Sequence, residues 1–295
     1  MMKKQFVRSL RRPAFLRRGC LAVIAWILLV SALIPTASAA AAFPPNASPT
    51  RVYLDGKELL PGECIILQSV TYVPLRKFCN LFADCEISWN AKTSTATVKT
   101  KDLTMTVQSG AIYITANGHY FYTVGEVRNL GGHLYVPIRP LARALALSVN
   151  WNAKQRHVEL AREGNVRAVA PATYNKDELY WLSRIISAEA KGEPLLGQIA
   201  VGNVVLNRVD SPSYPNTIYG VIFDRKYGTQ FSPVSLGTIY QAPSASAVIA
   251  AKICLEGYRI SDQILFFLNP RIATNHWIEQ ARPYAFTIGN HQFYN

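Results

Sequence analysis

A single carboxylate, Glu189, falls on the apolar stripe of an expected helix. Leu182, Ile185 and Ile186 recur at helical spacing, and Glu189 follows Ile185 by four residues and Ile186 by three. Partial burial there, in the last turn before Gly192, disfavours the charged form and raises the pKa of the carboxyl group. A carboxylic acid that stays protonated near neutral pH can donate a proton to a leaving oxygen, as cleavage of a glycosidic bond requires.

The same spacing has a structural interpretation, in which the carboxyl group reaches water or pairs with Arg184 or Arg208. Spacing alone favours this interpretation, because ion pairs within a fold perturb pKa values as active sites do. The helix itself is well specified. Asn175 as N-cap, with Glu178 three residues on, fits a capping box.

The residues that follow predict a mostly helical domain that ends in a small sheet. A second helix begins at Pro194 and carries Gly202, whose lack of a side chain permits close helix packing. A third helix is expected over 243–256. Two strands are expected over 264–270 and 285–294.

The N-terminus has the composition of a secretory signal peptide. Residues 1–39 combine seven basic residues and no acidic one with an apolar run over 21–34 and the small-residue site Ala37-Ser-Ala39. Export is therefore expected, with an uncleaved membrane anchor as the alternative. Residues 40–50 are expected to form a flexible or extended linker.

The distribution of charge limits the possible partners of the protein. The seven basic residues of the signal account for more than half of the net charge of +13 and leave +6. Residues 51–170 hold 14 basic against 9 acidic residues, and residues 171–295 hold 10 against 9. This surplus suits an anionic cell-wall polymer or surface as partner of the first part, but it lacks the basic stripe of a nucleic-acid binder. No spacing predicts a metal or cofactor site.

The region after the linker is duplicated. Two segments recur at a period of about sixty residues. They are Tyr72–Arg76 with Trp89–Lys92, and Tyr135–Arg139 with Trp151–Lys154. Each copy predicts a short strand, a helix and two further strands. Turn signals at Asp55-Gly56 and Asn117-Gly118 predict a leading hairpin in each copy.

This β-rich α+β unit resembles the copper amine oxidase N-terminal-like domain over residues 51–161, which implies an adaptor or stalk on a bacterial surface protein. The resemblance brings no copper site, because the histidines of the region, His119, His133 and His157, are scattered. Its recurring aromatic residues are expected in the core. Residues 162–172 show no period and are expected to form an interdomain linker.

The C-terminal module carries a series of motifs in a fixed order. They are Ser187–Pro194, Gly197–Val209, Gly220–Phe223, Gln230–Ser232, Asn269–Thr274 with Trp277, and Ile288–Phe293. The motifs and their order resemble the SleB-type cell wall hydrolases, which include spore cortex-lytic enzymes, over residues 174–295. The resemblance implies a lysozyme-like domain, 173–295, that acts on peptidoglycan glycan strands as a lytic transglycosylase in cell wall turnover or spore germination. Glu189 then becomes the catalytic acid and base, which reverses the preference for a structural role.

The implied reaction needs one carboxyl group. Glu189 gives its proton to the oxygen between N-acetylmuramic acid and N-acetylglucosamine, and then takes the proton of the muramic 6-hydroxyl as a 1,6-anhydro ring closes. A hydrolytic muramidase, the alternative, usually has a second carboxylate, for which Glu193 and Asp224 are candidates. Glu193 is expected to serve the start of the second helix, and Asp224 a loop.

Sugar contacts are expected from polar and aromatic side chains of the motifs. The candidate substrate-binding residues are Gln230, Phe231, Ser232, Asn269, Thr274, Trp277 and Tyr227. For each of them, packing or turn capping is an equal alternative. Phe266 and Phe267 stand where the family often has Tyr before Asn-Pro, so a phenolic hydroxyl role does not carry over to that position.

Other classes fit less well. A zinc amidase needs a ligand cluster, and the module has only His276 and His291. A cysteine peptidase would use Cys254, which is expected late in a helix, where a thiol is not activated. The remaining alternative is a non-catalytic cell-wall binding protein. The expected location is secreted, at the cell wall or spore envelope, and peptidoglycan in general is a more secure substrate than spore cortex because the usual peptidoglycan-binding repeat is replaced by the duplicated module.

Overall fold

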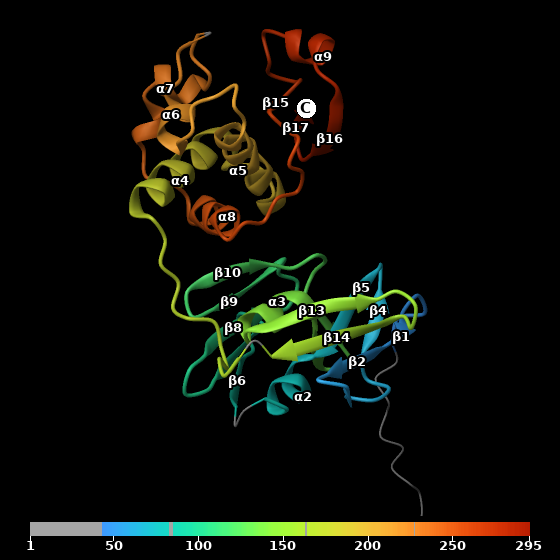
Figure 1. The fold of residues 1–295 in the computed structure, drawn as a ribbon. Coiled ribbons are helices and arrows are strands. Elements are labelled where there is room, and N and C mark those ends of the chain that lie inside the picture. Colours follow the sequence, from blue (N-terminus) through green and yellow to red (C-terminus); the bar gives the residue numbers. More distant parts are fainter. Residues whose placement is uncertain (1–42, 83–84, 163, 227) are drawn as a thin grey trace, which may run out of the picture. The chain divides into compact units, whose positions relative to one another are not determined.

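The computed structural model describes residues 43–295 except 83–84, 163 and 227 (Figure 1). Phe43–Asn295 form one compact unit. The signal peptide predicted over 1–39 lies outside the described residues. Within the described part of the chain, no helix has both the length and the apolar character needed to cross a bilayer.

The N-terminal part of this unit contains three sheets, and their strands come from both copies of the duplicated sequence. The first sheet contains, in spatial order, β1 (Ser48–Pro49), β4 (Ile65–Leu67), β5 (Val70–Pro74), β12 (His133–Pro137) and β11 (Arg128–Leu130). The second contains β10 (His119–Tyr122), β9 (Tyr113–Ala116), β8 (Thr104–Gln108), β7 (Thr95–Lys99) and β6 (Glu86–Asn90). The third contains β13 (Leu147–Asn152), β14 (His157–Arg162), β2 (Arg51–Leu54) and β3 (Lys57–Leu59). Two short helices, α2 (Leu75–Asn80) and α3 (Ile138–Ala144), follow the repeated Val-Pro pairs.

The two copies are interlocked. Their repeated strands β5 and β12 pair in antiparallel fashion, with Val73 opposite Val136. The hairpin β2–β3 of the first copy joins β13–β14 of the second through a parallel β2–β14 pair. Conversely, β9–β10, which leads the second copy, joins β6–β7 of the first through β8. Neither copy therefore forms its sheets alone, and one hydrophobic core serves both.

Both predicted hairpin turns are confirmed. Asp55 and Gly56 have φ values of 48° and 82°, and Asn117 and Gly118 have φ values of 48° and 87°. Two successive left-handed residues are the geometry of a type I′ turn, which Asp-Gly and Asn-Gly adopt at low cost.

The segment 162–172, predicted to be an interdomain linker, contacts the N-terminal part at several of its described residues. Ala168 is 9% exposed within its core. The backbone N–H of Val169 donates to the carbonyl of Ala144 at 3.0 Å, and the N–H of Ala172 donates to the carbonyl of Asn117 at 2.9 Å. Among the segment's described residues Ala168 alone is buried, and Val166 is 55% exposed.

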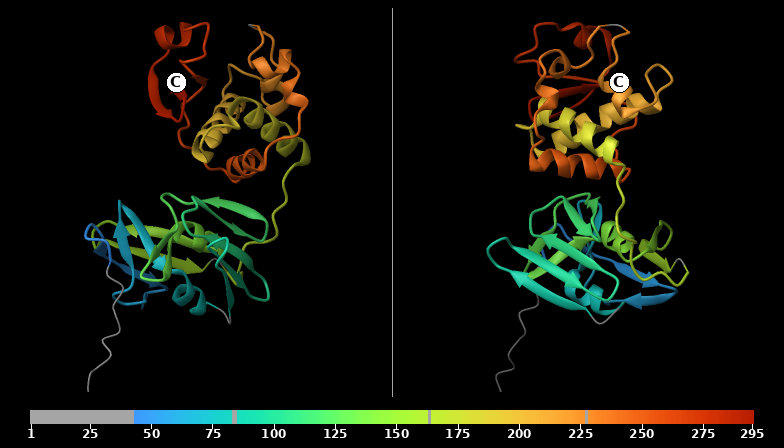
Figure 2. Two further views of the ribbon diagram at one scale, coloured as in Figure 1. Left: turned by 180° about the vertical axis from the view of Figure 1, so that it is seen from behind. Right: turned by 90° about the vertical axis from the view of Figure 1, so that its left-hand side faces the viewer.

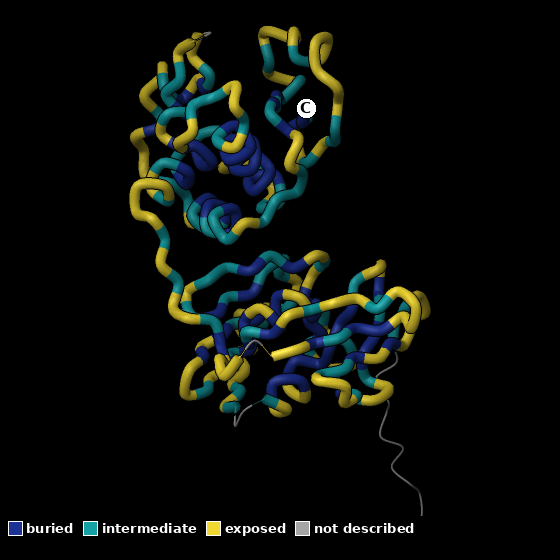
Figure 3. The backbone as a smooth tube through the Cα atoms, in the orientation of Figure 1, coloured by how far each residue is buried: buried dark blue, intermediate teal, exposed yellow. Residues whose placement is uncertain are grey.

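The C-terminal part is mostly helical, as predicted (Figure 1). Its helices are α4 (Lys176–Ala190), α5 (Leu195–Asp210), α6 (Ile218–Ile222), α7 (Ser232–Ser235), α8 (Ala245–Leu255) and α9 (Trp277–Ala281), with the 3₁₀ turn η2 (Thr238–Tyr240). Figure 3 shows buried backbone concentrated in α4, α5 and α8. The predicted cap of α4 is confirmed, because the Asn175 side chain accepts from the N–H groups of Asp177 and Glu178. Pro194 is the N-cap of α5 rather than its first residue.

Gly202 permits the close contact of α5 with α4 and α8. A methyl group built on Gly202 would lie 2.7 Å from Sγ of Cys254 and 2.8 Å from Cδ1 of Ile186. Both distances are shorter than any ordinary carbon contact. The prediction of close packing at this glycine is confirmed.

The C-terminal sheet has three strands, where the sequence predicted two. Its order is β15 (Phe266–Leu268), β17 (His291–Tyr294) and β16 (Tyr284–Ile288). The single strand predicted over 285–294 is a hairpin, because Gly289 has a φ of 60° and reverses the chain. Figure 2 shows these strands, drawn in red, beside the helices from two further directions.

Candidate active site

Glu189 lies in the last turn of α4, on the face that packs into the core. Leu182, Ile185 and Ile186 on that face are 0% exposed, while Glu189 is partly buried. Its carboxyl group forms no hydrogen bond or ion pair with the described residues. Of the structural interpretation, the pairing with Arg184 or Arg208 is therefore absent among the described residues, whereas the partial exposure of Glu189 is consistent with a carboxyl group that reaches water. Arg184 instead lies 3.9 Å from the ring centroid of Tyr180.

Burial dominates the electrostatics of Glu189. It raises the pKa of the carboxyl group from 4.5 to about 7, against the opposing charge of Arg208. At neutral pH the group is thus divided between its protonated and charged forms. It can donate a proton in one form and accept one in the other, as a group that acts first as an acid and then as a base must.

Arg208, on α5, is the cation whose charge lowers the pKa of Glu189. It is 5% exposed, and its Nε donates to the carbonyl of Leu265 at 2.8 Å. Its guanidinium carbon lies 5.1 Å from the ring centroids of Tyr214 and Phe231 and 5.6 Å from that of Phe266. Its Nη1 has no hydrogen-bond partner among the described residues.

This arginine is a buried charge without a paired carboxylate. Burial lowers the pKa of Arg208, and the charges of Asp224 and Glu189 raise it in opposition. An unpaired cation of this kind stabilises any negative charge that forms beside it. Its aromatic surroundings limit access of water, which would otherwise screen that charge.

The two candidate second carboxylates, Glu193 and Asp224, each accept a hydrogen bond from a backbone N–H group. Glu193 accepts from the N–H and the side-chain amide of Asn290 at 2.8 and 3.0 Å. Burial would raise the pKa of Glu193, but these hydrogen bonds and the charge of His291 hold it below its usual value. Glu193 therefore ties the loop between α4 and α5 to the β16–β17 turn. Asp224 accepts from the N–H of Lys226 at 2.9 Å and lies near enough to Arg208 to influence it.

Two family models match the chain. Residues 192–294 match the cell wall hydrolase family, and residues 53–160 match the copper amine oxidase N-terminal domain. The C-terminal part is a cell wall hydrolase domain. The match to the copper amine oxidase N-terminal domain covers the interlocked duplicated unit described above.

Known relatives share the hydrolase domain. The spore cortex-lytic enzyme of Bacillus cereus is 38% identical over 123 residues, which are 42% of this chain and 46% of that protein. The spore cortex-lytic enzyme of Bacillus subtilis is 36% identical over 132 residues, 45% of this chain and 42% of that protein. This chain thus spans about half the length of these relatives or slightly less.

Among solved structures, the catalytic domain of the germination-specific lytic transglycosylase SleB from Bacillus anthracis is 37% identical. The similarity covers 43% of this chain and 100% of that one, with a TM-score of 0.38. The catalytic domain of Bacillus cereus SleB is also 37% identical and covers 45% of this chain, with a TM-score of 0.37.

The hydrolase domain places two of the predicted sugar-contacting residues in the neighbourhood of Arg208. Phe231 contacts Arg208 directly but is 3% exposed, so its ring belongs to the core rather than to an open wall. Trp277 is 45% exposed, and its ring centroid lies 5.8 Å from that of Phe266, which also contacts Arg208. Trp277 therefore offers an aromatic surface on this side of the domain.

The other predicted sugar-contacting residues that the structure describes form turn contacts or lie exposed. The Asn269 side chain accepts from the N–H of Arg271 at 3.0 Å and so caps a turn. Gln230 donates to the carbonyl of Gly228 at 3.4 Å. Ser232 and Thr274 are exposed. Tyr227 lies outside the described residues.

Sequence reasoning considered Arg208 only as a partner for Glu189 and passed over two buried amides on the same helix. Asn203 donates to the carbonyl of Tyr258 and accepts from the N–H of Ile260, at 2.9 and 2.8 Å. Asn207 donates to the carbonyls of Ser261 and Ile264, both at 2.9 Å. The signal was available: polar residues four apart on an otherwise apolar helix need buried partners.

Cys254 is a core residue, as predicted. It is 1% exposed, and burial raises the pKa of its thiol to about 12. The thiol is therefore protonated at neutral pH and is not a nucleophile.

Proposed function

We propose that this protein degrades peptidoglycan by cleaving the bond between N-acetylmuramic acid and N-acetylglucosamine, as a lytic transglycosylase. The observation that carries the proposal is the state of Glu189: partly buried, without an ion pair, and with its pKa raised to about 7. The matches to a cell wall hydrolase family and to spore cortex-lytic enzymes support the choice of substrate. The solved SleB domain of Bacillus anthracis, which is 37% identical, is a lytic transglycosylase.

In the proposed reaction, Glu189 transfers its proton to the glycosidic oxygen as the bond to the muramic C1 breaks. Positive charge develops on the muramic ring, and the new Glu189 carboxylate lies beside the charge of Arg208. The muramic 6-hydroxyl then attacks C1 and returns its proton to Glu189. The products are an N-acetylglucosamine end and a 1,6-anhydro-muramic end, and no water is consumed.

Export to the cell wall or spore envelope belongs to the same proposal. Residues 1–39 would act as the signal peptide. The homology to spore cortex-lytic enzymes favours action at the cell wall or spore envelope.

Release of soluble fragments from purified sacculi tests the proposal. Glu189→Gln keeps the size of the side chain but cannot donate the proton, so the rate of release falls about 10²- to 10⁴-fold. Glu178→Gln is the matched control, because Glu178 is an exposed residue in the first turn of the same helix. Equal activity of Glu189→Gln and the unaltered protein would rule the proposal out.

A further inference from the structure

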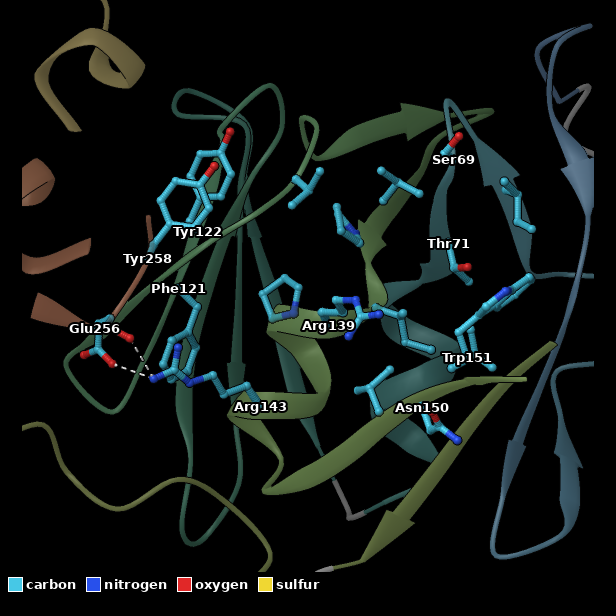
Figure 4. Close-up of a pocket in the computed structure, with 18 of the residues that line it drawn as sticks. Ser69, Thr71, Phe121, Tyr122, Arg139, Arg143, Asn150, Trp151, Glu256 and Tyr258 are labelled. Atoms are coloured by element: carbon cyan, nitrogen blue, oxygen red, sulfur yellow. Dashed lines mark hydrogen bonds and ion pairs between the residues drawn. The ribbon is translucent and has the colours of Figure 1, made fainter. Parts of the chain in front are cut away.

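The N-terminal part contains a groove that the hydrolase reaction does not use. Its volume is about 760 Å³, within the range that holds a ligand of a few rings. Helix α3 and strands β5, β10 and β13 supply more than half of its lining, and Glu256–Tyr258 also line it. Figure 4 shows Arg143 and Glu256 at one side of the lining and Trp151 at the other, with Arg139 between them.

The charge of the groove is positive. Its lining includes Arg139, Arg143 and Arg156 and a single carboxylate, Glu256. That carboxylate is 7% exposed and already engaged by Arg143 at 3.2 Å and by His119 at 2.6 Å. Arg139 and Arg156 are exposed and form no hydrogen bond or ion pair with the described residues. Two guanidinium groups are thus available to bind an anion.

An aromatic surface accompanies this charge. Trp151, on β13, is 38% exposed and lines the groove. The prediction that the recurring aromatic residues lie in the core is therefore confirmed for Tyr72 and Tyr135 and wrong for Trp89 and Trp151. Exposed Trp beside arginine suits a ligand that has both an apolar ring face and an anionic group. A sugar ring that carries a carboxylate meets both requirements, whereas a polyol phosphate chain has no ring to cover the indole.

The groove is lined by the tryptophan and the arginine of the second copy alone. Trp89 and Arg76 occupy the equivalent positions in the first copy, but neither lines this groove. Arg156 corresponds to Ser94, and the two residues occupy the same position in equivalent turns of the two copies, with φ values of 54° and 50°. The backbone is therefore repeated while the side chain has changed to a cation on the side of the groove.

We propose that this groove is a binding site for peptidoglycan, with a sugar ring of the glycan strand over Trp151 and carboxylates of the peptides attached to that strand on Arg139 and Arg156. The choice of peptidoglycan among anionic glycans rests on the proposed function of the hydrolase domain. A second site for the same polymer in the same chain raises its effective concentration at Glu189 without any new contact there.

Binding of the full protein to purified sacculi tests this site, with Glu189→Gln present in every variant so that the polymer stays intact. The sacculi are stripped of covalently attached phosphate polymers. Trp151→Ala weakens binding about tenfold, as loss of a central aromatic contact does. Arg156→Ser, which restores the residue of the first copy, weakens it about threefold and reduces its salt dependence. The matched controls Trp89→Ala and Arg76→Ala change the dissociation constant less than about twofold.

Equal losses in the Trp89 and Trp151 variants would overturn the inference, as would binding that disappears when the phosphate polymers are removed. Both tryptophans are exposed, so we expect the variants to fold, and circular dichroism checks the fold of each one. Fragment release by protein that retains Glu189 is measured in parallel. Binding that depends on Trp151, without release of fragments, would contradict the proposed function and support the binding site. Release of fragments, with binding that Trp151→Ala does not change, would support the proposed function and contradict the binding site.

Discussion

At the scale of single residues, the proposed chemistry depends on Glu189, whose carboxyl group has no hydrogen-bond or ion-pair partner among the described residues. Helical spacing was sufficient to predict that Glu189 faces the core and that burial raises its pKa, and both are confirmed. Spacing could not decide between a paired and an unpaired Glu, because that depends on where a second helix places Arg208. The orientation of Arg208 toward the Leu265 carbonyl and a set of aromatic rings is a tertiary result.

The pH dependence of activity reports the charge of Glu189. Only its protonated form starts the reaction, so the rate falls as pH rises through about 7. Arg208 lowers the pKa of Glu189, and Arg208→Gln should therefore move the alkaline limb of the rate profile to higher pH. Arg208→Lys, which keeps a positive charge, should leave the limb closer to its original position. An unchanged limb in Arg208→Gln would show that the arginine acts only through packing.

The same raised pKa makes the stability of the fold depend on pH. Between pH 4.5 and about 7 the folded protein keeps a proton on Glu189 that the unfolded chain has lost, so this group's contribution is full below 4.5 and is lost as pH rises through 7. Glu189→Gln has no proton to lose. Its free energy of unfolding, relative to the unaltered protein, should rise by about 3 kcal/mol between pH 4 and pH 8.

Denaturant titrations at the two pH values measure this difference. Glu178→Gln again serves as the control, since its side chain is exposed. A difference between Glu189→Gln and the unaltered protein that is the same at both pH values would contradict the raised pKa.

At the scale of elements, the sequence predicted most helices and missed what joins them. The α4 cap, the glycine contact of α5 and the I′ turns are local signals, and all are confirmed. The C-terminal hairpin was predicted to be one strand, although Gly289-Asn290 within it is a turn signal. Asn203 and Asn207 hold the segment 258–264 against α5 through backbone contacts that no local pattern contains.

Gly202 tests the packing of these helices. Gly202→Ala would force apart contacts of 2.7 and 2.8 Å with Cys254 and Ile186. Overpacking of this kind costs about 1–3 kcal/mol, more than the gain in helix propensity of about 1 kcal/mol returns. Thermal unfolding measures the effect, and Gly192→Ala is the control, since a methyl group there meets nothing within 4 Å. Equal stability of the two variants would contradict the close packing.

At the scale of the whole molecule, the duplication was visible in sequence but its pairing was not. Each copy predicts its own strands, yet β2 pairs with β14 from the other copy and β5 with β12. Strand partners are non-local, and a repeat period says nothing about which copy supplies the neighbour. The segment 162–172 shows the same limit, since its backbone hydrogen bonds go to the carbonyls of Ala144 and Asn117, which no local pattern in the segment predicts.

In the proposed reaction, Glu189 alone cleaves the glycan by transferring its proton, without a second carboxylate and without water. The decisive experiment is mass analysis of the soluble fragments from purified sacculi, with the unaltered protein and Glu189→Gln side by side. We expect 1,6-anhydro-muramic ends, made only by the unaltered protein. Reducing muramic ends would contradict the proposed reaction and direct attention to Asp224 beside Arg208, and identical fragments from both proteins would remove Glu189 from the reaction.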